Sequence, residues 1–145
     1  CWRIKKLGYK FMVEPKSFIY HVGGGTLPYL SPKKSYLNFR NSLFMLVKNH
    51  EGALFPKLVY RMLLDGLAAV RFIVLREWKH LASVFNAHMA LYKHLPILLQ
   101  QRKEIQQNKR ITNKAGLYQG SIIWARYFKG VTKFKSLNQR LFDSK

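Results

Sequence analysis

The sequence carries start and stop signals for three consecutive helices, and these signals constrain the fold more than any other feature of the chain. A hydroxyl N-cap followed by proline, Ser31-Pro32, is typical of a helix start. Pro96 is expected to bend or break the last of the three, because proline removes a helical hydrogen bond. The helices are predicted over residues 31–49, 55–78 and 79–108.

Before the first of these helices, residues 9–14 alternate so as to give two unlike faces, with Tyr9, Phe11 and Val13 on one of them, and residues 17–22 form a short, mostly apolar run. Both patterns are typical of β-strands. The predicted fold class is therefore α+β, mostly α, with a short β-strand pair followed by three helices. Three regions are predicted along the chain: residues 1–54, a helical region over 55–108, and a basic tail over 109–145.

The charge of the chain is strongly unbalanced, with 26 Lys and Arg against 6 Asp and Glu, a formal net charge of +20. Such a surface attracts nucleic acid, an anionic membrane or phosphorylated ligands, and composition does not choose among them. No window qualifies as a membrane-spanning helix, because the best one, residues 58–75, contains Arg61, Asp65 and Arg71. Cys1 is the single cysteine and excludes an internal disulfide. Because the first residue is not Met, a piece of a longer protein is expected.

The helix predicted over residues 55–78 has two unlike faces. Charged side chains share an arc of roughly 140°, and Arg61 and Asp65 are spaced to form an i, i+4 pair. The remaining face is broad and apolar, so the helix either belongs to the core or lies at a membrane surface. The charged residues are Lys57, Arg61, Asp65, Arg71 and Arg76, and the apolar face includes Leu58, Val59, Met62, Leu63, Val70, Phe72 and Ile73.

The segment around His21 is the first candidate for a binding site. Its three following glycines, Gly23 to Gly25, allow backbone N–H groups to approach an anion, although a flexible hairpin explains them equally well. His21 is a possible metal or phosphate contact, or a histidine hydrogen-bonded at a strand end. Arg40-Asn41 falls within the apolar stripe of a helix, where an arginine either binds an anion or extends to water. Neither a nucleophile nor a convincing carboxylate pair is visible.

These segments, in this order, resemble the C-terminal part of bacterial family-2 glycosyltransferases of the rhamnosyltransferase-like type. The resemblance rests on "CWRIKKLGYKF", "VEPKSFIYHVGGGT" and "YLNFRNSLFMLVKN". It is strongest over residues 1–50 and continues more loosely to about residue 105. It implies a nucleotide-sugar-binding α/β domain of GT-A type, whose N-terminal part, with the catalytic carboxylate and an aspartate-containing metal motif, would precede Cys1.

The resemblance also implies roles for particular residues. Mg²⁺ or Mn²⁺ would be shared with the missing N-terminal part, with His21 as one ligand. The expected reaction moves a sugar from a nucleotide-sugar donor to a lipid-linked or polysaccharide acceptor in cell-surface glycan synthesis, and the chain alone is expected to be inactive. The expected donor-diphosphate contacts are His21, Gly23, Gly24, Gly25, Arg40 and Asn41.

Membrane contact is expected from the helices after residue 54, on the cytoplasmic, inner face of the cell membrane. Anionic lipid would attract the basic surface, and the expected contact residues are Phe72, Ile73 and Trp78. The alternative function is a basic module that binds nucleic acid or a membrane surface without catalysis. Its support is the net charge, together with aromatic side chains interleaved among the cations of the tail.

Overall fold

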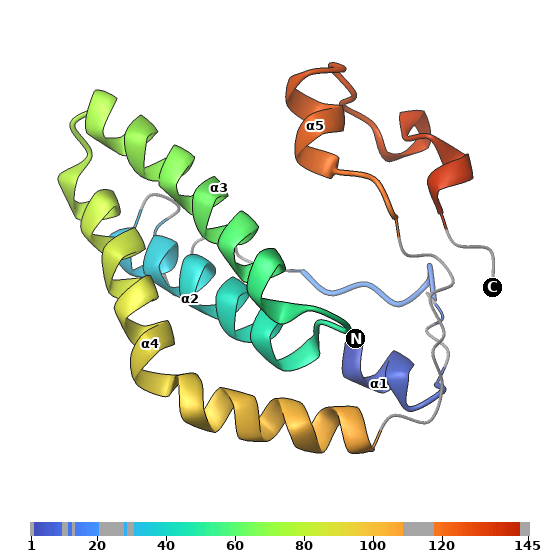
Figure 1. Cartoon of the computed structure of the whole chain (residues 1–145). Coiled ribbons are helices and arrows are strands. Elements are labelled where there is room, and N and C mark those ends of the chain that lie inside the picture. Colours follow the sequence, from blue (N-terminus) through green and yellow to red (C-terminus); the bar gives the residue numbers. More distant parts are fainter. Residues whose placement is uncertain are drawn as a thin grey trace. The chain divides into compact units, whose positions relative to one another are not determined.

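The computed structural model describes residues 2–9, 12, 14–20, 28, 31–108 and 118–142. These residues form two compact units, one that contains residues 31–108 and one that combines residues 3–9 with 118–142. The described part is mostly helical (Figure 1). Its helices are α1 (Trp2–Lys6), α2 (Pro32–Asn49), α3 (Leu54–Val74), α4 (Trp78–Gln107) and α5 (Ile122–Tyr127), with short 3-10 helices η1 (Phe134–Ser136) and η2 (Gln139–Leu141).

The three helices predicted between residues 31 and 108 are confirmed as α2, α3 and α4. Helix α2 begins at Pro32, as the Ser31-Pro32 signal predicts, although the side chain of Ser31 makes no capping hydrogen bond. Helix α3 ends at Val74, four residues earlier than predicted, and α4 begins at Trp78. Pro96 does not break α4, which continues through it and changes direction along its length (Figure 1).

The turn between α3 and α4 reverses the chain without a glycine. Arg76 has a φ angle of 57°, in the left-handed region. The Glu77 N–H donates to the Phe72 carbonyl at 2.8 Å, and the Arg76 N–H donates to the Ile73 carbonyl at 3.0 Å. These two bonds define a Schellman motif, in which the left-handed position is usually glycine. The sequence therefore gives no conventional stop signal here.

The core of this unit lies where α4 packs along α2, with α3 against both. Leu43 and Val47 of α2 and Leu91 and Leu98 of α4 are buried together. Side chains from α3 complete the cluster from one side, notably Leu58 and Met62. These three helices thus form one apolar centre with contributions from each.

Arg102 of α4 holds the end of α2 and the following loop. Its Nη1 donates to the Val47 carbonyl at 3.1 Å and to the His50 carbonyl, and its Nη2 donates to the Gly52 carbonyl at 3.1 Å. Gln106 adds a bond to the His50 carbonyl at 3.3 Å. The last carbonyls of a helix lack partners within the helix, and a cation there also suits the helix dipole.

The predicted β-strand pair is wrong for the described residues of its two segments, none of which is in a strand. The turn at Pro15 and Lys16 is held locally, with the Ser17 N–H donating to the Glu14 carbonyl at 3.1 Å. Residues 17–20 are exposed. A strand needs a neighbour to take its backbone hydrogen bonds, and the described residues provide none for these segments. The alternating pattern over a few residues predicts an extended backbone, but it does not specify a neighbouring strand for that backbone to pair with.

The second unit is small and rich in aromatic contacts. The rings of Trp124 and Phe128 stack at 4.1 Å, and those of Tyr118 and Phe142 lie 5.0 Å apart. An antiparallel bridge joins Tyr118 to Phe142. Ser121 caps α5, with its Oγ accepting from the Trp124 N–H at 3.2 Å. Part of the basic tail is therefore folded.

Candidate functional site

Four of the predicted donor-site residues, His21 and Gly23 to Gly25, lie outside the described residues, so their roles stay predictions. Among the residues that are described, no group of three or more His, Cys, Asp or Glu side chains could hold a metal ion. The resemblance places only one metal ligand, His21, in this chain, so the shared metal site stays a prediction. Arg40 and Asn41 are the members of the predicted set that the structure describes.

Arg40 lies half-buried on α2 and is held by its own helix. Its Nε and Nη2 donate to Asn41 Oδ1 at 3.1 and 2.9 Å. Its guanidinium also lies over the rings of Tyr36 and Phe44, at 5.3 and 5.7 Å from their centroids. Aromatic faces attract a cation, which explains how an arginine occupies this apolar stripe. A role in binding diphosphate stays a prediction.

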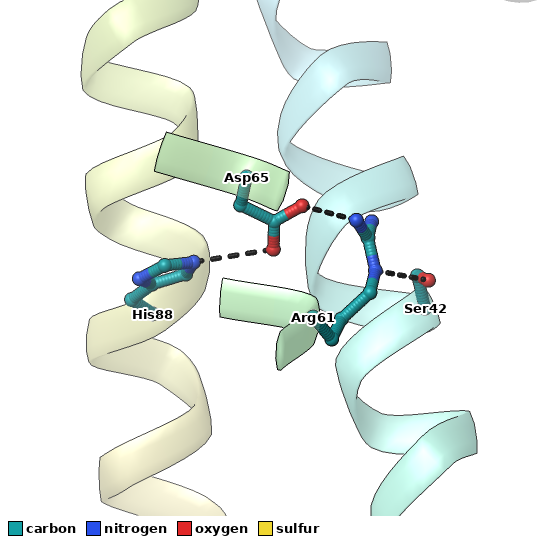
Figure 2. A network of polar contacts seen from close by, with 4 residues as sticks. All are labelled: Ser42, Arg61, Asp65 and His88. Atoms are coloured by element: carbon teal, nitrogen blue, oxygen red, sulfur yellow. Dashed lines mark hydrogen bonds and ion pairs between the residues drawn. The ribbon is translucent and has the colours of Figure 1, made fainter. Parts of the chain in front are cut away.

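A polar network joins all three long helices, and Figure 2 shows its four residues. Asp65 of α3 is completely buried. Its Oδ1 lies 2.5 Å from Arg61 Nη1, and its Oδ2 lies 3.3 Å from Nε2 of His88 on α4. Arg61 Nε donates to Ser42 Oγ of α2 at 3.3 Å. The predicted Arg61–Asp65 pair is thus confirmed, as the centre of a larger network.

Burial dominates the electrostatics of Asp65. Removal from water raises the pKa of its carboxyl above the ordinary 3.8, while the charge of Arg61 and the hydrogen bond to His88 act in the opposite direction without offsetting it. Oδ1 makes the ion pair with Arg61 but no well-aligned hydrogen bond. An ionised carboxylate can only accept, so His88 Nε2 then carries the ring proton. The network is therefore held together at a net electrostatic cost.

His88 was not among the residues predicted from the sequence. Its spacing could have revealed it, because His88 lies four residues after Val84 and three before Leu91, both buried on the same face of α4. A histidine at such a position requires a polar partner from the facing helix. The carboxylate of Asp65 is that partner.

The orientation of α3 bears on the membrane contact predicted for the helices after residue 54. The charged pair Arg61 and Asp65 points inward, toward α2 and α4. Large apolar side chains point away from this unit, and Leu67 is 68% exposed and Val74 75% exposed. Their spacing of three or four residues places them on one face. We call this set the outer face of α3: Val59, Leu63, Leu67, Val70 and Val74.

Of the three predicted membrane-contact residues, Phe72 and Ile73 lie in the last turn of α3 and Trp78 begins α4, and they are in two different settings. Ile73 and Trp78 are exposed. Phe72 is half-buried, and its ring stacks on that of His80 at 5.4 Å. Phe72 thus faces α4 rather than sharing the outer face of α3.

Comparisons with protein-family models, with curated proteins and with solved structures find no match to this chain. No helix in the described part is both long enough and apolar enough to cross a membrane.

Proposed function

We propose that this chain is the C-terminal portion of a family-2 glycosyltransferase that works at the inner face of the cell membrane. The enzyme would move a sugar from a nucleotide-sugar donor to a lipid-linked or polysaccharide acceptor in cell-surface glycan synthesis. Support for the sugar-transfer part comes from the quoted motifs, with Arg40-Asn41 on a regular helix that begins at Pro32. The exposed apolar side chains of Phe18, Ile19 and Tyr20 also suit a surface that another part of a longer protein covers.

The observation that carries the membrane part of the proposal is the outer face of α3. Membrane-surface helices combine an apolar face with flanking cations and aromatic residues near their ends. Phe55 and Lys57 lie at the start of α3, and Arg71 lies in its last turn. Trp78 follows at the start of α4 and is exposed. The net charge of +20 adds attraction to anionic lipid.

In this proposal the chain contributes binding and position rather than proton transfer. Arg40 would meet the donor diphosphate, because a guanidinium fork binds two phosphate oxygens at once. A divalent metal would neutralise the departing diphosphate. The catalytic carboxylate and most metal ligands would belong to the preceding part of the enzyme, so the isolated chain is expected to be inactive.

A second candidate function, nucleic-acid binding without catalysis, is favoured by one specific observation in the second unit. Trp124, Tyr127 and Phe128 are exposed on and just after α5, beside Arg126 and Lys129. Stacking of bases on exposed aromatic rings, combined with phosphate contacts, is how many proteins bind single strands. This function predicts binding to a random-sequence RNA oligonucleotide that weakens steeply with salt.

Vesicle flotation of the full chain tests the membrane part. Wild type is expected to float with vesicles that contain phosphatidylglycerol. Leu67→Glu is expected to reduce binding by more than about tenfold, because it removes an exposed leucine whose burial in the bilayer is worth ~1.5–3 kcal/mol and adds a negative charge. Asn86→Glu on the exposed side of α4 is the control with the same change in charge. Binding that Leu67→Glu and Asn86→Glu reduce equally would refute docking through α3.

The coding sequence upstream of Cys1 tests the sugar-transfer part. An open frame that encodes acidic residues just before Cys1 and an aspartate-containing motif further upstream is the expected result. A start codon immediately before Cys1 would refute the glycosyltransferase assignment and leave the basic surface as the main indication of function.

A further inference from the structure

A surface cavity of about 660 Å³ lies where the turn between α3 and α4 meets the start of α2. Three cations line it, Arg71, Arg76 and Lys79, against one carboxylate, Glu77. Such an excess of positive charge at a concave surface concentrates anions. The first residue of α2, Pro32, also lines the cavity, so the positive end of that helix dipole adds to the same field.

The shape of this cavity is held by contacts between α2 and α4. Ser35 Oγ lies 2.8 Å from Nδ1 of His80, and Ser83 Oγ donates to the Pro32 carbonyl at 2.8 Å. The stacked ring of Phe72 supports His80 from α3. Contacts among three helices therefore fix Ser35 and His80, two of the polar residues that line the cavity.

Arg76 is the residue that points most directly to a ligand. It occupies the left-handed position of the Schellman motif, with φ 57°, where glycine is the least strained residue. Strained backbone at a non-glycine residue is common where a side chain is needed for binding. Here the strained residue is also one of the cations that line the cavity.

The surroundings of the cavity indicate which anion it accommodates. The outer face of α3 leads to this turn through Val70 and Val74, and Leu75 and Trp78 are exposed beside it. A ligand seated here meets cations and exposed apolar side chains together. A lipid head group with an exposed phosphate has this combination, because its acyl chains continue from the phosphate into the bilayer.

We infer that the cavity at the α3–α4 turn binds the phosphate of a lipid head group, with Arg71, Arg76 and Lys79 as its charged contacts. This inference rests on the proposed docking of α3 to a membrane and identifies the lipid that it selects. Guanidinium groups suit this role, because their N–H groups pair with two phosphate oxygens at once. A carboxylate can also be bound in this way, but a phosphomonoester offers three terminal oxygens instead of two, so several cations can bind it together.

The test compares two kinds of vesicle that carry equal negative charge in phosphatidylcholine, one from phosphatidic acid and one from cholesteryl hemisuccinate. Wild-type chain is expected to bind the phosphatidic acid vesicles about tenfold more tightly, the effect of roughly one charge-assisted hydrogen bond. Equal binding to the two vesicles would overturn the inference while leaving membrane docking intact. Failure to bind either vesicle would instead overturn the proposed function.

Arg76→Gly separates a binding role from a structural one. It relieves the left-handed strain, so the urea midpoint is expected to rise, while the preference for phosphatidic acid is expected to disappear. Lys57→Gln removes the same charge from the opposite end of α3 and is expected to keep the preference. A preference that survives in Arg76→Gly, or that is lost equally in Lys57→Gln, would refute a specific site.

Soluble glycerol phosphate identifies the source of the phosphate. A lipid site is expected to resist competition by millimolar glycerol phosphate, because the soluble molecule lacks the apolar contacts beside the cavity. Complete displacement from phosphatidic acid vesicles by the soluble anion would show that the cavity recognises free phosphate and would overturn the lipid assignment.

Discussion

Replacement of Arg102 by methionine tests how the three-helix unit is held together. Methionine keeps much of the apolar stem but removes the guanidinium that bonds the carbonyls of Val47, His50 and Gly52. Because these carbonyls lie at the end of α2 and in the loop to α3, the change releases the connection between two helices.

The size of the effect follows from the number and exposure of these bonds. A hydrogen bond from a charged donor contributes ~1.5–3 kcal/mol when buried. The bond to Gly52 is exposed, so water replaces it with little loss, and Gln106 still donates to the His50 carbonyl. The bond to the Val47 carbonyl is lost in full and the bond to the His50 carbonyl only in part, which gives a loss of about 2–4 kcal/mol. In a domain of this size such a loss lowers the melting temperature by more than about 8 °C.

The assay is urea unfolding followed by circular dichroism, with two companion variants. Arg102→Lys keeps the charge but not the fork and is expected to lose roughly half as much. Lys103→Met, at the exposed next residue of α4, removes a charge without touching these carbonyls and is expected to change stability by less than ~0.5 kcal/mol. If Arg102→Met were no more destabilising than Lys103→Met, the assigned role of Arg102 would be wrong.

Three further predictions concern single positions in the same unit, each measured by urea unfolding. Gly52→Ala and Gly66→Ala meet no atom within 4 Å of the added Cβ, yet their effects are expected to be opposite: Gly52 has φ 87° and its replacement costs about 1 kcal/mol, whereas alanine at the helical Gly66 gains about 1 kcal/mol. Stability changes in the same direction at Gly52 and Gly66 would contradict this. Asp65→Asn is expected to stabilise the chain increasingly as pH rises. The raised pKa of Asp65 means that its contribution to stability is present below pH 3.8 and is lost as pH rises through the folded-state pKa; a constant difference from wild type between acid and neutral pH would refute this. Pro96→Ala restores a helical donor inside α4 and is expected to stabilise by about 1–3 kcal/mol, and destabilisation would show that packing requires the bend.

The helices could be predicted from the sequence because their signals are local. Ser31-Pro32 marks the start of α2 through the fixed φ of Pro32 at the first helical position, since the Ser31 side chain makes no capping hydrogen bond. The end of α3 was not predicted, because no local signal marks it. Arg76 occupies the left-handed position at which a glycine usually shows where a helix ends. The prediction of a strand pair was wrong because pairing depends on a partner elsewhere in the chain, which a short alternating pattern does not specify.

The candidate site was only partly predictable. The i, i+4 spacing of Arg61 and Asp65 predicted that they pair, but not that the pair faces the other two helices. A polar arc on an amphipathic helix is normally solvated. Here His88 of α4 and Ser42 of α2 bond to Asp65 and Arg61, so this pair faces inward while Lys57 and Arg71 of the same arc stay exposed. The partners come from separate helices, so the orientation of α3 is a property of the assembled unit.

This orientation is what connects the buried network to the outer face of α3. With α3 turned the other way, its large apolar side chains would enter the core and the charged pair would return to water, which avoids the cost of burying Asp65. The unit instead leaves Leu63, Leu67, Val70 and Val74 exposed. Covering each of them is worth roughly 1.5–3 kcal/mol before the costs of association. Arg61, His88 and Asp65 are thus in contact in the arrangement that leaves these apolar side chains exposed. The proposed docking of α3 on a bilayer would cover them and is expected to offset part of the cost of burying Asp65.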